Sequence, residues 1–257
     1  MDSGAPEKTD YIMIVTTIIK SIKDYDDQWF EYELSSLPRW RREKADKIKP
    51  SDSRKLSILS GKLISDVFRE YDVDPDNVTF NKSGKPMIPG NDAPFFFSIS
   101  HSKNAVAISI SNPNDNSPVL PGEDKIDVVD VFKAAAIPPK SSLKSSRGLS
   151  FPSIGIDIEY VREYDEKIVK RFFTADEQDY LKVSSDRDEA FTRIWTSKEA
   201  YGKFTGVGME DGLKFSIFHN PSVPLDVILP CCFEHNEKEI SGDRYIYTIC
   251  YGVIEEL

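Results

Sequence analysis

Two acidic residues stand two positions apart in a short apolar segment, Gly155-Ile156-Asp157-Ile158-Glu159. Alternate residues of a strand point to the same side, so Asp157 and Glu159 should present both carboxylates on one face. Neighbouring carboxylates repel each other unless a cation lies between them, and a divalent ion with oxygen ligands is the natural occupant. The alternative is a pair of solvated acids on an edge strand. The flanking isoleucines disfavour it, because they bury the opposite face.

A second segment, from Trp195 to Lys203, has the pattern of a helix. Trp195, Glu199 and Lys203 follow one another at four-residue steps and therefore share one face. A carboxylate that can act as a base beside an ammonium group suits a reaction at phosphate. The alternative is an exposed ion pair with the tryptophan in the core, which is common in helices.

Three further residues have both a chemical and a structural interpretation. Glu177 completes the segment Thr174-Ala175-Asp176-Glu177, a capping box, and residue logic alone favours the cap over a metal ligand. His101 lies in a polar link between two predicted strands, where its imidazole can meet a phosphate or an attacking hydroxyl, or be only solvated. Lys85, before Pro86, is a candidate phosphate contact or a simple turn lysine.

Basic residues concentrate in one part of a chain that is acidic overall. The 43 acidic and 33 basic residues give a net charge of −10 and a pI of about 4.9, which argues against a nucleic-acid binder. Charges act locally over about 8–10 Å, so a basic patch can still bind an anion. The alternative is a solvated helix face. The patch comprises Arg39, Arg41, Arg42, Lys44, Lys47, Lys49, Arg54 and Lys55.

Cysteine content and hydropathy indicate a cytoplasmic protein. Cys231, Cys232 and Cys250 lack the spacing of a zinc site or a disulfide framework, which fits a reducing compartment. The longest apolar run, residues 11–19, is shorter than the roughly 18 residues that a membrane span needs. No basic segment precedes it, so we expect neither a secretory signal nor a membrane partner.

Apolar periodicity predicts an α+β fold with two similar halves and a site between them. In the N-terminal half, residues 1–111, we expect strands over 11–19, 95–100 and 105–111, a helical segment over 34–49 and a helix over 55–71. In the C-terminal half, residues 154–257, we expect a strand over 153–159, helices over 166–172, 175–182 and 186–204, and strands over 213–218, 227–229 and 245–253.

Residues 112–153 differ in composition from both halves. Six prolines lie between 113 and 152, and only residues 127–136 have the pattern of a short helix. A connection of this length is typical of an insertion or linker. The strands over 105–111 and 153–159 flank it and could pair as an antiparallel hairpin, in which case the segment should be removable.

Five motifs occur in a fixed order: Gly84-Lys85-Pro86, Phe97-Ser98-Ile99-Ser100-His101-Ser102, Gly155-Ile156-Asp157-Ile158-Glu159, Arg171-Phe172-Phe173-Thr174-Ala175-Asp176-Glu177, and Trp195-Thr196-Ser197-Lys198-Glu199 through Lys203. In order and spacing they resemble the Sfp-like 4′-phosphopantetheinyl transferases, over roughly residues 38 to 216. The short, trimeric branch of this superfamily carries one half per chain. The length of 257 residues therefore points to the long monomeric branch, a pseudo-dimer with its active site between the halves.

The resemblance implies Mg²⁺-dependent transfer of the 4′-phosphopantetheine arm of coenzyme A to a serine of an apo carrier protein, with release of 3′,5′-ADP. The carrier would be of the acyl, peptidyl or aminoadipate-reductase type. Asp157, Glu159 and Glu177 are then expected to hold Mg²⁺. Glu199 matches the general base, and Lys203 matches the residue that stabilises or protonates the leaving phosphate.

The resemblance also assigns the contacts with coenzyme A. Ser100, His101 and Lys85 match such contacts, as does Lys198, and His101 is also counted among the catalytic residues. The family binds the 3′-phosphate with an N-terminal basic cluster, for which Arg41 and Lys44 have suitable spacing. Arg54 is a further candidate ligand.

Two other classes of function share these residues. One is a module of the same fold that binds coenzyme A or a carrier without turnover, and Glu199 with Lys203 counts against it because a binder needs no base. The other is a metal-dependent phosphodiesterase, in which water would be the nucleophile.

Overall fold

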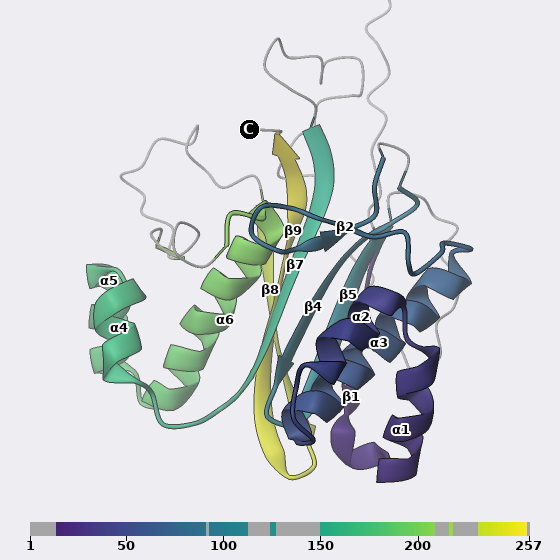
Figure 1. Ribbon diagram of the computed structural model, residues 1–257. Helices are drawn as coiled ribbons and strands as arrows, with labels where there is room; N and C mark the ends of the chain where they lie inside the picture. Colours follow the sequence, from purple (N-terminus) through teal and green to yellow (C-terminus); the bar gives the residue numbers. More distant parts are fainter. Residues whose placement is uncertain are drawn as a thin grey trace, which may run out of the picture.

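The computed structural model describes residues 14–90, 93–112, 124–126, 150–208, 216–217 and 231–255. They form a mixed α/β structure in which helices pack on antiparallel sheets (Figure 1). The N-terminal elements are β1 (Ile14–Ser21), the short helix η1 (Ile22–Asp24), α1 (Asp27–Ser36), α2 (Arg39–Asp46), α3 (Asp52–Glu70), β2 (Thr79–Phe80), β3 (Pro86–Met87), β4 (Phe96–Ser102), β5 (Ala105–Asn112) and β6 (Asp124–Ile126). The C-terminal elements are β7 (Ser150–Tyr160), α4 (Glu166–Phe172), α5 (Ala175–Val183), α6 (Arg187–Thr205), β8 (Cys231–Ile240) and β9 (Asp243–Glu255).

The N-terminal sheet has the strand order β4-β5-β1-β6, with antiparallel neighbours throughout. Helix α3 covers one face of it and begins at Ser51, whose side chain accepts a hydrogen bond from the Arg54 amide. Its apolar stripe, which includes Leu59, Leu63 and Val67, is buried in a core shared with the even-numbered residues of β5. The helix is therefore amphipathic, as its sequence predicts.

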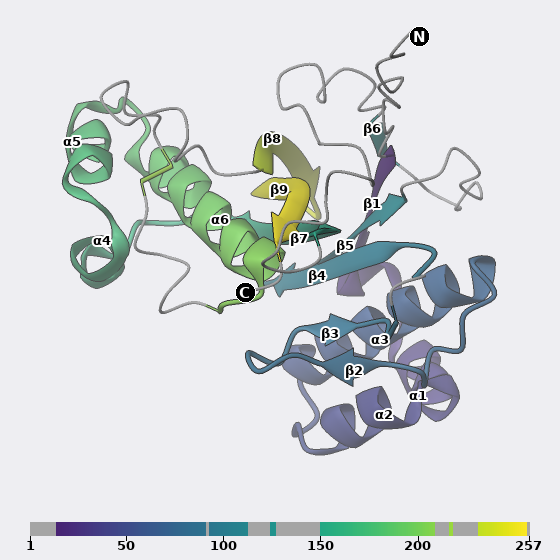
Figure 2. The same cartoon turned by 90° about the horizontal axis from the view of Figure 1, so that it is seen from above.

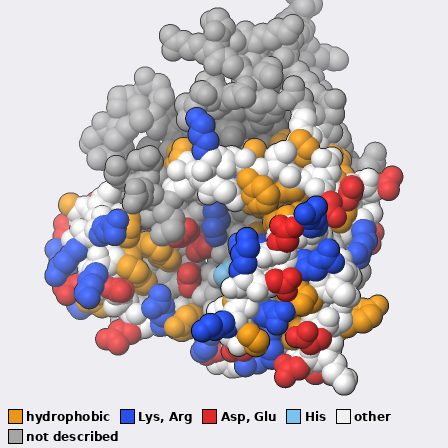
Figure 3. Space-filling view, in the orientation of Figure 1, with side chains coloured by type: hydrophobic (Ala, Val, Ile, Leu, Met, Phe, Trp, Pro, Cys, Tyr) orange, Lys and Arg blue, Asp and Glu red, His pale blue; other side chains and the backbone are white. Residues whose placement is uncertain are grey.

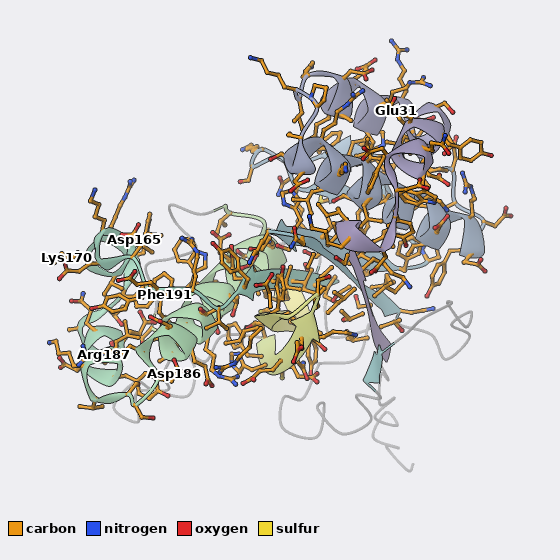
Figure 4. All side chains as sticks on the ribbon, turned by 90° about the horizontal axis from the view of Figure 1, so that it is seen from below. Glu31, Asp165, Lys170, Asp186, Arg187 and Phe191 are labelled. Atoms are coloured by element: carbon orange, nitrogen blue, oxygen red, sulfur yellow. The ribbon has the colours of Figure 1, made fainter. Side chains whose placement is uncertain are left out.

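The C-terminal sheet has the order β7-β9-β8 and is covered by α6 (Figure 1). Strand β7 pairs with β9 along its whole length, from Ser150 opposite Glu255 to Tyr160 opposite Tyr245. Helix α6 begins after the N-cap Asp186 and ends at Gly206, whose φ of 72° lies in the left-handed region. Viewed from below, Phe191 lies along the first turns of α6 beside α4 and α5 (Figure 4).

The two halves repeat one strand order, because in each sheet the first strand pairs with the last strand of a hairpin. They meet where β4 and β5 lie against β7, with α3 and α6 on opposite sides of the seam (Figure 2). Val15 and Ile19 of β1 share an apolar cluster there with isoleucines of β7. The odd-numbered residues of β7 point away from this cluster, and they include Asp157 and Glu159.

The structure corrects three predictions about elements. Strands β5 and β7 do not form a hairpin with each other, since β5 pairs with β1 and β4 while β7 pairs with β9. The helical segment predicted over 34–49 is divided at Leu37 and Pro38, because proline cannot continue the first helix and instead begins the second. Strand β8, which the sequence did not predict, is an edge strand with few buried residues and so lacks a clear apolar pattern.

Several predictions lie outside the described residues. They concern the helix over 127–136, the strand over 227–229, most of the strand over 213–218 and most of the insertion over 112–153. Within that insertion, β6 adds a fourth strand beside β1, and β7 already begins at Ser150. Among the helices that the structure describes, none combines the length and the apolar character that a membrane crossing requires.

Candidate active site

Asp157 and Glu159 lie on β7 with their side chains on the face that meets α6, as the alternation predicts. Asp157 is 4% exposed, and Thr248 of β9 stands opposite it in the ladder. One of its carboxylate oxygens, Oδ2, is buried and has no hydrogen-bond partner among the described atoms. A buried carboxylate oxygen that accepts no hydrogen bond destabilises the folded state unless a bound ligand interacts with it.

Three alternate serines of β4, which we call the serine row (Ser98, Ser100 and Ser102), join β4 to β7. Ser98 Oγ accepts a hydrogen bond from the Ile156 amide over 3.1 Å. Ser100 donates to Asp157 Oδ1 over 2.7 Å, and Ser102 donates to Glu159 Oε2 over 2.5 Å. The two acids are therefore oriented by hydroxyl groups of the other half of the molecule. The family resemblance assigned Ser100 to coenzyme A, and Ser102 was not among the predicted site residues, although the two serines share the period of two of a strand.

Gly155 lets α6 approach β7 closely. A Cβ at this position would lie 2.0 Å from the Ala200 carbonyl oxygen and 2.5 Å from the Phe204 amide nitrogen, both backbone atoms of α6. No L side chain fits that space. Glycine therefore sets the distance at which Glu199 and Lys203 of α6 face the acids of β7.

Replacing Gly155 with alanine is expected to lower the free energy of unfolding by about 1–3 kcal/mol, because the helix backbone must move. The activity of the site should fall by about 10²-fold, since a shift of about 1 Å is enough for such a loss. Urea unfolding measures the change in stability, and the rate at which an apo carrier protein gains mass measures the change in activity. Gly61→Ala is the matched control, because its nearest contact, at 2.9 Å, is the end of the flexible Leu37 side chain. Equal stability and activity for Gly155→Ala and the control would contradict this account of the helix position.

Lys203 provides the cation that the two acids require. Its Nζ donates to Asp157 Oδ1 over 2.6 Å and to Ser100 Oγ over 2.8 Å, and its side chain is 27% exposed. The alternative interpretation, an exposed i,i+4 ion pair between Glu199 and Lys203, is therefore not what the structure shows, because Lys203 of α6 pairs with Asp157 of β7. The ion-pair partner of Lys203 in this structure is Asp157.

Glu159 and Glu199 form a group of acids with Asp157, which we call the acid cluster. Burial, and then the negative charge of Asp157, raises the pKa of Glu159 to about 7. Burial and the same charge raise the pKa of Glu199 to about 7. The structure therefore places Glu199, rather than Glu177, beside the acids of β7. A carboxyl with this pKa is suited to accept a proton near neutral pH.

Cations of the N-terminal half face the cleft. Lys85 Nζ donates to the Ile154 carbonyl oxygen over 2.9 Å, and burial lowers the pKa of this lysine to about 8. The pKa of His101 is lowered by burial first and then by the positive charges of Lys203, Arg41 and Lys44. His101 thus lies where the positive charges of Lys203, Arg41 and Lys44 all act on it.

A cavity of about 320 Å³ opens between the halves. Its wall includes the β2–β3 turn, which is held to the end of α6 by a hydrogen bond of 2.9 Å from Asn81 Nδ2 to the Gly206 carbonyl oxygen. In the space-filling view, charged side chains of both signs gather along a hollow between the halves (Figure 3). The cavity is lined by Ser83, Gly84, Lys85, Pro86, Phe97, Ser98, Ile99, Lys198, Glu199, Gly202, Lys203, Gly206 and Gly208.

Glu177 does not join the acid cluster. Its carboxylate accepts hydrogen bonds from the Thr174 amide over 2.8 Å and from the Ile217 amide over 2.9 Å, which confirms the predicted capping box. It also forms an ion pair of 3.0 Å with Lys198, and both side chains are fully buried. The carboxylate thus already has three donors. Lys198 neutralises a buried acid, and this contact accounts for its position without coenzyme A.

Arg41 and Arg54 differ in how free they are to bind an anion. Arg41 is 5% exposed; its Nη2 donates to the Ser57 carbonyl oxygen, while its Nε is buried without a partner among the described atoms. Burial lowers its pKa to about 10. The Nε of Arg54 is likewise buried without a partner among the described atoms, but its other two nitrogens form ion pairs with Glu31 and Asp46. Arg41 is therefore the better candidate for a phosphate ligand.

Glu177→Gln is expected to lower the free energy of unfolding by about 3–5 kcal/mol, because the buried Lys198 loses its carboxylate partner. Glutamine still accepts the hydrogen bond of the cap, so the loss of stability reports the missing negative charge and not the missing cap. Asp179→Asn, which removes an exposed ion pair with Lys182, is the control and should cost less than about 1 kcal/mol. Unchanged stability together with a raised Mg²⁺ requirement for activity would restore Glu177 as a metal ligand.

Comparison with known proteins agrees with this geometry. Residues 153–250, which contain the acid cluster, match the model of the 4′-phosphopantetheinyl transferase superfamily. The 4′-phosphopantetheinyl transferase psf-1 of Bacillus pumilus is 48% identical over 62 residues, 23% of this chain and 27% of that protein. HetI of Nostoc sp., also named as such a transferase, is 40% identical over 75 residues, 28% of this chain and 32% of that protein.

The matches to these two relatives thus span about a quarter to a third of their length. The 4′-phosphopantetheinyl transferase Sfp of Bacillus subtilis is 27% identical over 205 residues, 77% of this chain and 73% of that protein. The longer match includes residues of both halves. The segment that holds the acids therefore matches the 4′-phosphopantetheinyl transferase superfamily, and the resemblance of the chain to Sfp-type transferases is confirmed.

Proposed function

We propose that this protein transfers the 4′-phosphopantetheine arm of coenzyme A to a serine hydroxyl of an apo carrier protein and releases 3′,5′-ADP. The observation that carries the proposal is one cavity lined by Glu199, Lys203 and Lys85, in which Lys203 also pairs with the buried Asp157. Acids that can hold a cation, a base with a pKa near 7 and two lysines are what transfer from a diphosphate requires.

The residues of the cleft fit Mg²⁺. Within the described residues, no three carboxylate, imidazole or thiol groups stand close enough to hold an ion by themselves. Mg²⁺ characteristically uses one or two carboxylates and completes its shell with substrate phosphates and water. Asp157, with its buried free oxygen, and Glu159 would hold it, with Glu199 beside them. When bound, the ion neutralises charge on the diphosphate and favours its displacement.

Coenzyme A would lie across the seam between the halves. Lys85 and His101 would contact the diphosphate, and Arg41 with Lys44 would contact the 3′-phosphate at the outer end of the cleft. Ser100 hydrogen-bonds both Asp157 and Lys203, so we assign to it the alignment of these two residues. Glu177, Lys198 and Arg54 support the fold around this site.

Glu199 would accept the proton of the carrier serine as its oxygen attacks the phosphorus atom next to the pantetheine arm. The bond from that phosphorus to the bridging oxygen of the diphosphate breaks, and 3′,5′-ADP leaves. Lys203 would exchange its hydrogen bond with Asp157 for one to the leaving phosphate, on which negative charge develops. The proton thus ends on Glu199.

The repeated strand order supports the proposed pseudo-dimer of two related halves. A chain that already carries both halves has a complete cleft, so we propose that it acts as a monomer. The carrier would approach the open side of the cleft, where Glu199 is partly exposed.

The decisive experiment incubates the protein with coenzyme A, Mg²⁺ and an apo carrier protein and then weighs the carrier. The expected result is a mass gain of one phosphopantetheine group that requires Mg²⁺. A carrier of unchanged mass with coenzyme A bound to the protein indicates a binding module of the same fold. Hydrolysis of coenzyme A without transfer indicates a phosphodiesterase, and either result refutes the proposal.

A further inference from the structure

The serine row makes three different contacts with β7. Ser98 bonds a backbone amide, and Ser100 is shared between Asp157 and Lys203. Ser102 alone of the three bonds Glu159. Among the described residues, it is the hydrogen-bond donor to this carboxylate. Ser98 and Ser100 therefore do not share the role of Ser102 as the donor to the Glu159 carboxylate.

We propose that Ser102 is a positioning residue, which holds the Glu159 carboxylate in the orientation that binds the metal ion. The inference rests on the proposed function, because it needs a metal at Asp157 and Glu159. Ser102 touches neither substrate nor ion; it acts through the acid. A glutamate side chain has three torsions, so a fixed hydrogen bond restricts it more than the strand alone can.

Ser102 is itself held in place. It is the last residue of β4 and pairs with Ala105, and the turn between them places Lys103 at a φ of 50°. This turn is attached to β9 by the Lys103–Asp243 ion pair of 2.6 Å and by the Asn104 amide, which donates to the Tyr245 hydroxyl over 3.2 Å. The donor that orients Glu159 is therefore fixed to the sheet on which Glu159 lies.

Burial makes the hydroxyl hard to replace. Ser102 is 8% exposed, so there is little access for a water molecule that would donate to Glu159 after the hydroxyl is removed. Alanine at this position leaves the carboxylate free to turn, and it removes one donor that favours the charged form. Both changes weaken the metal site. Neither removes an atom of Lys85, His101, Arg41 or Lys44, to which the contacts with coenzyme A are assigned.

Ser102→Ala is expected to weaken metal binding by about 10–100-fold, the usual loss when a residue behind a metal ligand is removed. The direct measurement is titration with Mn²⁺ at saturating coenzyme A without carrier, in which the electron spin resonance signal reports free Mn²⁺. In the transfer assay, the Mg²⁺ concentration for half-maximal rate should rise by a similar factor. The KM for coenzyme A should stay within about twofold.

Ser109→Ala is the matched control. It removes another buried hydroxyl from the same sheet, one that bonds Thr17 over 2.6 Å and no acid. The control should leave the Mn²⁺ affinity unchanged, and Ser102→Thr should restore it because threonine keeps the hydroxyl. In a Glu159→Gln background, Ser102→Ala should cause no further loss of Mn²⁺ affinity, because Ser102 affects the metal only by orienting Glu159.

Equal Mn²⁺ affinity for Ser102→Ala and Ser109→Ala would overturn the inference while leaving the proposed function intact, provided that the wild-type protein transfers the arm. A parallel loss of coenzyme A and Mn²⁺ affinity would also overturn it, because that result marks a general structural role. If the wild-type protein neither binds Mn²⁺ with coenzyme A nor modifies a carrier, the proposed function fails first. The wild-type measurement separates this last result from the other two, and the coenzyme A affinity of Ser102→Ala separates those two from each other.

Discussion

Replacing Asp157 with asparagine is expected to reduce transfer by about 10²–10⁴-fold at saturating Mg²⁺, because the residue has two roles in the cleft. Its charge is needed to hold the ion, and its Oδ1 accepts hydrogen bonds from Lys203 and Ser100. Asparagine keeps the shape but not the charge, so Lys203 loses its counter-ion. The rate of mass gain on the carrier measures the effect.

The fold should survive this substitution. Burial raises the pKa of Glu159 and Glu199 most, and the charge of Asp157 raises it further. Removing that charge relieves the repulsion, so thermal stability without metal should stay the same or rise. Asp66→Asn is the control, because it removes the charge of an ion pair of the same length, 2.6 Å, that Asp66 forms with Lys62 on α3, outside the cleft. A transfer rate for Asp157→Asn within a factor of a few of the control would rule out the assigned roles.

Glu199→Gln is expected to slow transfer by about 10²–10⁴-fold, the usual effect of losing a general base. Glutamine cannot take the proton of the carrier serine, while Lys203 and Asp157 stay in contact. The KM for coenzyme A should change little. Single-turnover measurement with the carrier mixed last isolates this step from product release.

The structure makes a second role for Glu199 testable in the same variant. Because Glu199 lies in the acid cluster, the substitution could slow transfer by weakening metal binding instead of by removing the proton acceptor. A raised Mg²⁺ requirement with full rate at high Mg²⁺ would identify a metal ligand and exclude the base. A reduced rate at every Mg²⁺ concentration supports the base.

Sequence patterns predicted the centre of the site because its geometry is local. The period of two in β7 places Asp157 and Glu159 on one face, and the four-residue step in α6 places Glu199 and Lys203 together. The principal helices and the four longest predicted strands are confirmed for the same reason, since each follows from apolar periodicity along one segment. The close approach of α6 at Gly155 could also be predicted, because a glycine inside an apolar strand indicates that another segment's backbone passes close to it.

Contacts between segments far apart in sequence could not be predicted in this way. Nothing local shows that Lys203 pairs with Asp157, or that Lys198 neutralises Glu177. The first pairing depends on how α6 packs on β7, and the second on how α5 packs on α6. Family resemblance assigned Glu177 to the metal, whereas the capping box that its local sequence indicated is what the structure shows. Arg54 likewise faces acids of α1 and α2 that no short motif reveals.

The pairing of each first strand with a late strand sets the order in which the molecule can assemble during synthesis. Strand β1 finds its partner once residue 112 has emerged, so the N-terminal sheet can close early. Strand β7 must wait for β9, which begins at Asp243 and ends at Glu255. Asp157 and Glu159 therefore lie on a strand that cannot complete its ladder until residue 255 has left the ribosome. Until then, β7 lacks the strand with which it pairs along its whole length.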